Sequence, residues 1–102
     1  MTANKSERLR RNIEFEFTRN RLRASQIDTM IAAFDRTCAD LGLQIEAEEK
    51  RMRISDPTHF AYPTYAKAAR ERCAKLQRSA AALRIELDRL QVNEFSNTQF
   101  AA

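Results

Sequence analysis

The chain has 102 residues, 31% of them charged, and a formal net charge of +4. This length allows one domain at most, and a single glycine excludes a glycine-rich phosphate-binding loop. Ala, Glu, Lys, Leu and Arg make up half of the chain, a composition typical of coiled coils when it occurs with a 3.5-residue period. No run of alternating Val, Ile and Thr predicts a β-strand.

The first residues, MTANKSERLRRN, are polar and lack the apolar core of a signal peptide. The sequence contains no run of 18 apolar residues, so no transmembrane helix is expected. We therefore expect a cytoplasmic protein whose thiols stay reduced. Cys38 and Cys73 are then interpreted as small apolar core residues, with a redox crosslink between them as the alternative.

A first helix is predicted from about residue 7 to about residue 53, with Ser6 as its N-cap. From Ile13 onward, alternating steps of four and three residues meet apolar side chains at ten of twelve positions. Because this pattern repeats every 3.5 residues, it keeps one apolar side along a supercoiled helix. These twelve positions form the first seam: Ile13, Phe17, Asn20, Ala24, Ile27, Ile31, Phe34, Cys38, Leu41, Ile45, Glu48 and Met52.

A turn is predicted at about residues 54–62. It contains Asp56-Pro57, and the residue before a proline is disfavoured in the α-helical region. A second helix, about residues 63–93, then begins at Pro63, since a proline in the first turn leaves no helical hydrogen bond unmade. Its nine seam positions are all apolar and form the second seam: Tyr62, Ala66, Ala69, Cys73, Leu76, Ala80, Leu83, Leu87 and Leu90.

The predicted fold class is all-α: an elongated, antiparallel two-helix coiled-coil hairpin that forms a single domain over residues 1–102. Because the second seam stops after Leu90, residues 94–102 are predicted to be a flexible tail. Pairing the two seams symmetrically about residue 57 sets Cys38 near Leu76. It also leaves the residues before about 22 without a partner on the second helix.

This overhang is predicted to be a docking surface for another protein or for a second copy of the chain. Its seam residues are uncovered, a second apolar strip lies off the seam, and its flank is basic. The alternative is that the tail FSNTQFAA folds back over it, or that the segment frays. The predicted partner-binding residues of the overhang are Arg8, Arg11, Ile13, Phe15, Phe17, Arg19 and Leu22.

Two aromatic residues of the turn region, Phe60 and Tyr65, have two interpretations. They cap the end of the hairpin, or they form a second partner-binding patch.

The sequence does not predict an enzyme. His59, the only histidine, has no cysteine or second histidine at ligand spacing, so no metal site is expected. A two-helix hairpin offers no enclosed pocket, so we expect no catalytic residues and no cofactor. Basic residues are spread around the second helix and mixed with acidic ones, so we expect no nucleic-acid partner and at most a peripheral association with a membrane.

Three segments carry a resemblance to a known family: QIDTMIAAFDR (26–36), IEAEEKR (45–51) and above all ISDPTHFAYPTYAKAARER (54–72). From about Arg8 to Leu90 the chain resembles the FliJ family, the small coiled-coil component of the bacterial flagellar type III export apparatus. Because the second seam ends near Leu90, earlier than in most members, the chain resembles a short or divergent member.

The resemblance implies an antiparallel coiled coil similar to the central stalk of rotary ATPases. It implies a non-enzymatic role in flagellar protein export and hence motility, at the cytoplasmic face of the flagellar base. The implied partners are the hexameric export ATPase, the cytoplasmic domain of the export gate and the export chaperones, with Arg8 to Arg23 nearest the ATPase. The alternative to this role is a self-associating structural coiled coil, a homodimer of hairpins in a four-helix bundle.

Overall fold

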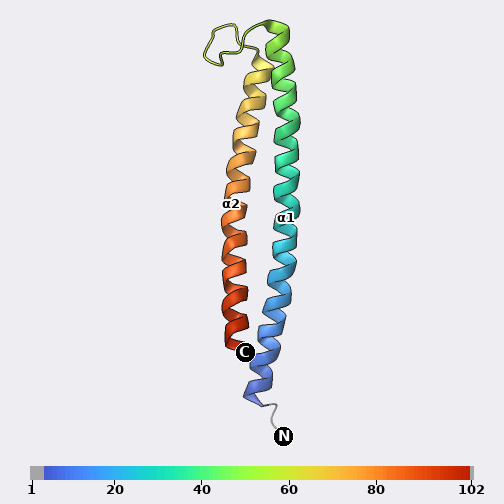
Figure 1. Cartoon of the computed structure of the whole chain (residues 1–102), viewed down its shortest axis with the longest axis vertical. Helices are drawn as coiled ribbons and strands as arrows, with labels where there is room; N and C mark the ends of the chain where they lie inside the picture. Colours follow the sequence, from blue (N-terminus) through green and yellow to red (C-terminus); the bar gives the residue numbers. More distant parts are fainter. Residues whose placement is uncertain (1–3, 102) are drawn as a thin grey trace. The chain divides into compact units, whose positions relative to one another are not determined.

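The computed structural model describes the backbone of residues 4–101 and the side chains of residues 4–93. Two α-helices, α1 (Lys5–Met52) and α2 (Thr64–Ala101), are joined by a turn at residues 53–63 (Figure 1). No strand occurs within residues 4–101. The predicted all-α helical hairpin is therefore confirmed.

The helices contribute to two compact units. Unit 1 combines Met1–Thr29 with Leu83–Ala102, and unit 2 is Met30–Ala82, which contains the turn. Each unit therefore holds one part of α1 and one part of α2. In the described part of the chain, neither helix contains a stretch apolar enough and long enough to cross a membrane.

Both predicted seams are buried or half-buried. Eleven of the twelve positions of the first seam are at least half-buried, and only Met52, at the end of α1, is exposed. All nine positions of the second seam are buried or half-buried. The 3.5-residue period therefore identifies the inward side of each helix correctly.

The core of unit 2 lies next to the turn and pairs large residues of α1 with small residues of α2. Leu41 and Ile45 pack with Tyr62, and the other two buried members of the cluster are Ala66 and Ala69. Alternation of large and small side chains across two elements fills the space between them without strain. Full burial of a Leu or Ile side chain stabilises a fold by about 1.5–3 kcal/mol.

A left-handed residue ends α1. Arg53 has φ = 59°, and the N–H of Ile54 donates to the Glu49 carbonyl oxygen at 3.3 Å. This is the Schellman arrangement, in which the second residue past the helix bonds back across its last turn. Ile54 also packs against the core cluster of unit 2, which anchors the chain as it leaves α1.

The turn is held by its own hydrogen bonds. The Asp56 carboxylate accepts the Thr58 N–H at 2.9 Å and the Thr58 hydroxyl at 2.7 Å. The His59 N–H donates to the Asp56 carbonyl oxygen at 3.1 Å, and the Tyr62 N–H donates to the His59 carbonyl oxygen at 3.0 Å. The Asp56-Pro57 signal therefore lies in a turn, as the sequence predicts.

The start of each helix differs slightly from its prediction. Asn4, rather than Ser6, caps α1: its side-chain oxygen accepts the Ser6 N–H at 3.3 Å, and its carbonyl accepts the Arg8 N–H at 3.2 Å. At α2, Pro63 lies just before the first helical residue, and its carbonyl accepts the Lys67 N–H at 3.0 Å.

The predicted end of the second helix near residue 93, with residues 94–102 as a flexible tail after it, differs from the structure. The structure continues α2 to Ala101, eight residues past the expected end near residue 93, so residues 94–101 are helical; residue 102 lies outside the described part. In unit 1 the last turns of α2 run beside α1, and only the first turns of α1 extend past them (Figure 1). The predicted overhang of all residues before about 22 is therefore wrong: α2 continues beside most of them, and only the first turns of α1 extend past it.

The predicted register is also wrong, by about one layer. The Cys38 thiol donates to the carbonyl oxygen of Cys73 at 3.5 Å, so Cys38 lies beside Cys73 and not beside Leu76. The physical reason is the asymmetry of the turn. Its residues project to one side of unit 2 instead of arching evenly over the end of both helices (Figure 1).

Candidate protein-binding surfaces

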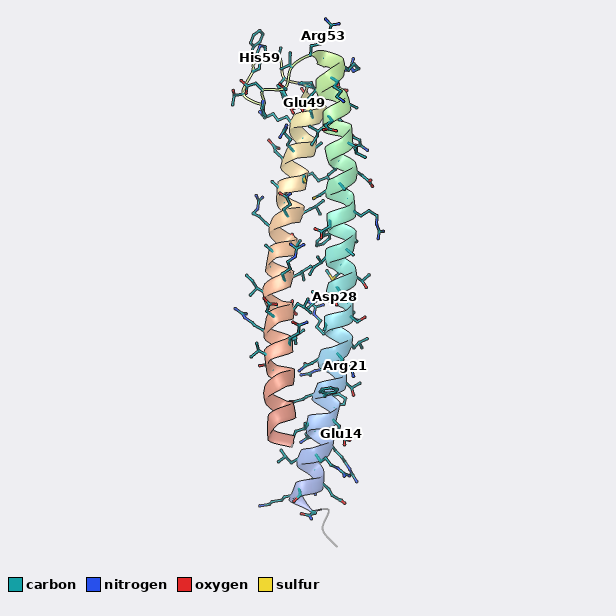
Figure 2. All side chains as sticks on the ribbon, viewed as in Figure 1. Glu14, Arg21, Asp28, Glu49, Arg53 and His59 are labelled. Atoms are coloured by element: carbon teal, nitrogen blue, oxygen red, sulfur yellow. The ribbon has the colours of Figure 1, made fainter. Side chains whose placement is uncertain are left out.

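The turn presents one fully exposed aromatic residue. Phe60 is 96% exposed, although phenylalanine is among the residue types that folding normally buries. Its ring stacks on His59, with centroids 4.7 Å apart and planes inclined by 21°. The His59 ring nitrogen Nδ1 in turn accepts the Ala61 N–H at 3.0 Å. Figure 2 shows His59 on the loop that projects from the helices, so the pair faces solvent.

Tyr65 belongs to the first turn of α2 and is tied to α1. It is 55% exposed, and its hydroxyl donates to the side-chain oxygen of Gln44. The described ring contacts join Phe60 to His59 and not to Tyr65. The two aromatic residues singled out in the sequence are therefore held by different partners, and their role in binding stays a prediction.

A network of three side chains fixes the turn to both helices. The Tyr62 hydroxyl donates to Glu49 Oε2 at 2.9 Å and accepts from Arg70 Nε at 2.7 Å. Arg70 Nη2 also donates to Glu49 Oε2 at 2.9 Å, and its guanidinium carbon lies 5.9 Å from the Tyr62 ring centroid. One residue each of α1, the turn and α2 is thereby joined in a closed triangle.

This network shifts the protonation equilibria of its members. The hydrogen bond from Arg70, and after it the one from Tyr62, lowers the pKa of Glu49 below its ordinary value. The hydrogen bond to Tyr62, and after it the one to Glu49, raises the pKa of Arg70. Outside this network, the hydrogen bonds from Thr58 lower the pKa of Asp56 in the turn. The heptad pattern gives no sign of the network, since Glu49 and Arg70 lie outside both seams.

Beside the turn, the end of α1 borders a shallow hollow. It has a volume of about 260 Å³ and is lined by Glu46, Glu49, Lys50, Arg53, Ile54 and Ser55. This volume is below the range of about 300–1,000 Å³ typical of small-molecule pockets. Within residues 4–101, no group of three or more His, Cys, Asp or Glu side chains could hold a metal ion.

In unit 1, the predicted partner-binding residues fall on two different sides of α1. Ile13 and Phe17 are half-buried, so they are not the uncovered seam residues that were predicted. The Arg21 guanidinium lies 5.4 Å from the Phe17 ring centroid and covers part of this ring. Phe15 and Leu22, in contrast, are 67% and 61% exposed. The apolar strip off the seam is therefore solvent-facing, as predicted.

The basic residues of the prediction lie with that exposed strip. The side chains of Arg8, Arg11 and Arg19 are all exposed. Near them, an ion pair joins the two helices in unit 1: Arg23 Nε and Nη2 donate to the two Glu86 carboxylate oxygens at 2.9 and 3.1 Å. This pairing lowers the pKa of Glu86 and raises that of Arg23.

The two cysteines are free thiols in a half-buried position of unit 2. The hydrogen bond with Cys73, followed by burial, raises the pKa of the Cys38 thiol to about 11. A thiol with this pKa is almost fully protonated at neutral pH, and the thiolate is the reactive form. Cys73 also packs against the core cluster of unit 2, which agrees with the interpretation of these residues as core thiols.

Comparison with known proteins gives no relative: no protein-family model, no curated protein and no solved structure matches the chain.

Proposed function

We propose that the protein is a non-enzymatic coiled-coil component of the bacterial flagellar type III export apparatus, which acts by binding other export proteins. Two features support this proposal. The first is the resemblance of residues 54–72 to the FliJ family. The second, which carries the most weight, is that this same segment forms an ordered turn with Phe60 96% exposed.

An exposed phenylalanine on an ordered turn is well suited to bind a protein. Burial of such a side chain in a partner's pocket contributes about 1.5–3 kcal/mol, and aromatic residues in central pockets are typical hot spots of interfaces. The turn hydrogen bonds of Asp56 and the stacking on His59 already fix the presentation of Phe60. Little conformational entropy is then lost on binding, which favours affinity.

In this proposal the protein couples its partners by contact. The start of α1 lies nearest the export ATPase, and the turn contacts the cytoplasmic domain of the export gate or an export chaperone. The complex forms at the cytoplasmic face of the flagellar base, where the ATPase, the gate and the chaperones meet. No step of this role requires a catalytic group or a cofactor.

The test is a binding assay with three purified partners from the same cell: the flagellar export ATPase, the gate cytoplasmic domain and an export chaperone. The full chain is compared with Phe60→Ser and with the control Leu43→Ser, which alters a residue of unit 2 that is 67% exposed but far from the turn in sequence. ATP turnover is measured with and without the chain.

We expect at least one partner to bind, with an affinity at least tenfold weaker for Phe60→Ser and unchanged for Leu43→Ser. A folded chain that binds none of the three partners contradicts the proposal. A mass of twice 11.8 kDa for the isolated chain at micromolar concentration would instead favour the self-associating coiled coil.

A further inference from the structure

The net charge of the protein lies entirely in its first 23 residues. That segment has seven basic residues and three acidic ones, whereas the remaining 79 residues have eleven of each. The chain's net charge of +4 is therefore the charge of the start of α1 alone. A local excess of this kind favours association with an acidic partner.

On α1 these basic residues are sorted around the helix. At 100° per residue, Arg8, Arg11, Arg19, Leu22 and Gln26 all lie within about 40° of Phe15. We call these six residues the basic stripe. The acidic residues of the segment, Glu7, Glu14 and Glu16, lie about 80–100° away from Phe15 around the helix axis, so none of them belongs to the stripe.

The basic stripe lies on the side of α1 opposite its buried seam. The buried Ile27, which is 0% exposed, and the half-buried Ile13 and Phe17 lie about 120–160° from Phe15 around the axis. All six stripe residues are exposed, Phe15 to 67% and Leu22 to 61%. The stripe therefore lies outside the buried seam of α1 and faces solvent.

The arginines of the stripe are also free to bind. In the described structure Arg8, Arg11 and Arg19 form no ion pair, whereas Arg10 lies 3.9 Å from Glu14 and Arg23 is bound by Glu86. Beside the stripe is a shallow hollow of about 320 Å³ lined by Arg19, Asn20, Leu22, Arg23 and Gln26. Apolar surface, a hollow and unpaired positive charge thus occur together on one side of the helix.

We propose that the basic stripe binds an acidic amphipathic helix of another protein. Phe15 and Leu22 are seven residues apart, or two helical turns, which is the spacing at which one helix packs its apolar side chains against another. The guanidinium groups beside them suit carboxylates, which they bind in a planar, two-pronged geometry. The partner helix carries apolar residues at i and i+7, with Glu or Asp on both flanks.

This inference deepens the proposed function and rests on it, because it names the chemistry of one protein partner. Two other anionic partners fit less well. A nucleic acid would use the arginines for its phosphates but leave Phe15 and Leu22 exposed to water. A membrane surface requires a broad apolar side, and the basic stripe offers only these two apolar residues over its five turns.

The experiment is a selection from a displayed library of 21-residue helical peptides. The library keeps Leu at i, i+7 and i+14 and randomises the flanking positions among Glu, Lys, Gln and Ala. It is selected against the full-length chain, and the enriched peptides are then titrated as synthetic peptides. We expect Glu to be enriched on both flanks, and we expect the affinity to fall as salt concentration rises.

Two variants assign the binding to the stripe, and each has a matched control. Phe15→Ala with Leu22→Ala should weaken the selected peptide at least tenfold, whereas Leu43→Ala, at an equally exposed site of unit 2, should not. Replacement of the three stripe arginines by Gln should weaken it at least tenfold. The control replaces three exposed arginines of unit 2 by Gln and so removes the same net charge: Arg36, Arg72 and Arg78.

Three outcomes would overturn the inference. They are a selection without enrichment of Glu, equal loss of binding in the control variants, and tighter binding of a DNA duplex or an anionic phosphatidylserine vesicle than of any selected peptide. Failure of the proposed function is a separate result. If the selected peptide binds at the stripe but none of the flagellar partners binds the chain, the stripe is confirmed as a helix-binding surface and the flagellar assignment is wrong.

Discussion

The hydroxyl of Tyr62 donates a 2.9 Å hydrogen bond to the carboxylate of Glu49, thirteen residues earlier in the chain. This bond joins the turn to α1, and Arg70 extends it to α2 with a 2.7 Å bond to the same hydroxyl. Tyr62 is 8% exposed and therefore has two contributions: its ring packs in the core, and its hydroxyl oxygen holds the network together.

Tyr62→Phe isolates the second of these contributions. The ring remains in the core and only the hydroxyl is lost, so we expect the free energy of unfolding to fall by about 1 kcal/mol. Urea unfolding followed by circular dichroism measures the change. Tyr65→Phe is the matched control, because Tyr65 also bonds across the hairpin but is 55% exposed; an equal loss in both variants would show that burial does not set the value.

Acid should destabilise the fold through its paired carboxylates. Hydrogen bonds lower the folded-state pKa of Glu49 and Glu86 below the unfolded value, which is about 4.3 for Glu. A lowered folded-state pKa contributes stability that is fully present above the unfolded pKa and is lost as the pH falls through the folded pKa. We expect the melting temperature to be constant from pH 8 to 6 and to fall below about pH 4.5.

Variants at two glutamates test the source of this acid sensitivity. Glu49→Gln should flatten the pH dependence of the melting temperature, because its side chain no longer gains or loses a proton. Glu71→Gln, which alters an exposed side chain outside the network, should keep the wild-type profile. Identical profiles for both variants would place the acid sensitivity elsewhere in the protein.

Cys38 should react slowly with alkylating reagents. Its thiol pKa is raised to about 11 from an ordinary value of 9.0, first by the hydrogen bond with Cys73 and then by burial. At pH 8 the thiolate fraction is then about a hundredfold lower than for a thiol with pKa 9.0. In the Cys73→Ser variant, which leaves Cys38 as the single cysteine, we expect the labelling rate to rise with pH as the thiolate fraction of Cys38 increases.

The measurement is the rate of iodoacetamide labelling of the Cys73→Ser variant between pH 7 and 10, with a short unstructured cysteine peptide as the reference. Rapid labelling of Cys38 in the Cys73→Ser variant at pH 8, at the rate of the peptide, would contradict the raised pKa.

The left-handed conformation of Arg53 predicts opposite effects of two substitutions. A residue other than glycine at φ = 59° carries roughly 1–2 kcal/mol of strain. Arg53→Gly removes this strain, with a partial offset from the greater entropy of glycine in the unfolded chain, so we expect a gain of about 0.5 kcal/mol. Arg53→Val adds a β-branched side chain at positive φ and should cost more than about 1 kcal/mol. Equal stability of the two variants would exclude this explanation.

Gly42, the only glycine of the chain, should tolerate and favour a side chain. It lies inside α1, and a Cβ atom added there meets nothing within 4 Å. Gly42→Ala should therefore stabilise the protein by about 0.5–1 kcal/mol, because glycine loses more conformational entropy in a helix. Ala39→Gly, at an exposed site on the same helix, is the reverse control and should cost a similar amount.

The sequence predicts well which side of each helix faces inward. It predicts less well where the helices end and how they are aligned with each other. Periodicity is enough to identify Ile27 and Leu41 in α1 and Ala66 in α2 as buried, because the spacing of apolar residues along each helix decides which of its sides faces inward. The end of a helix does not have to coincide with the end of its seam. Residues 94–101 contain neither glycine nor proline, so backbone hydrogen bonding continues after the apolar pattern stops.

The candidate surfaces depend on features that no local pattern contains. The exposure of Phe60 follows from a turn that projects sideways. A phenylalanine in the turn segment looks the same in the sequence whether it caps the hairpin or faces solvent. The network of Glu49, Tyr62 and Arg70 requires the true register, which differs from the symmetric one by about a layer. The exposed strip of Phe15 and Leu22, in contrast, was visible in the sequence because both residues lie off the seam.

The distribution of contacts along the chain also has a consequence for the order of folding. Near the turn, Tyr62 and Glu49 are separated by 13 residues, whereas the Arg23–Glu86 pair of unit 1 closes a separation of 63 residues. Contacts that are local in sequence form fast, and long-range ones must first overcome loop-closure entropy. The hairpin should therefore nucleate at its turn, and unit 1 should be the last part to form and the first to open. In hydrogen exchange, the helix that carries the basic stripe would then show its lowest protection at the stripe, which leaves that segment the most adaptable to a partner helix.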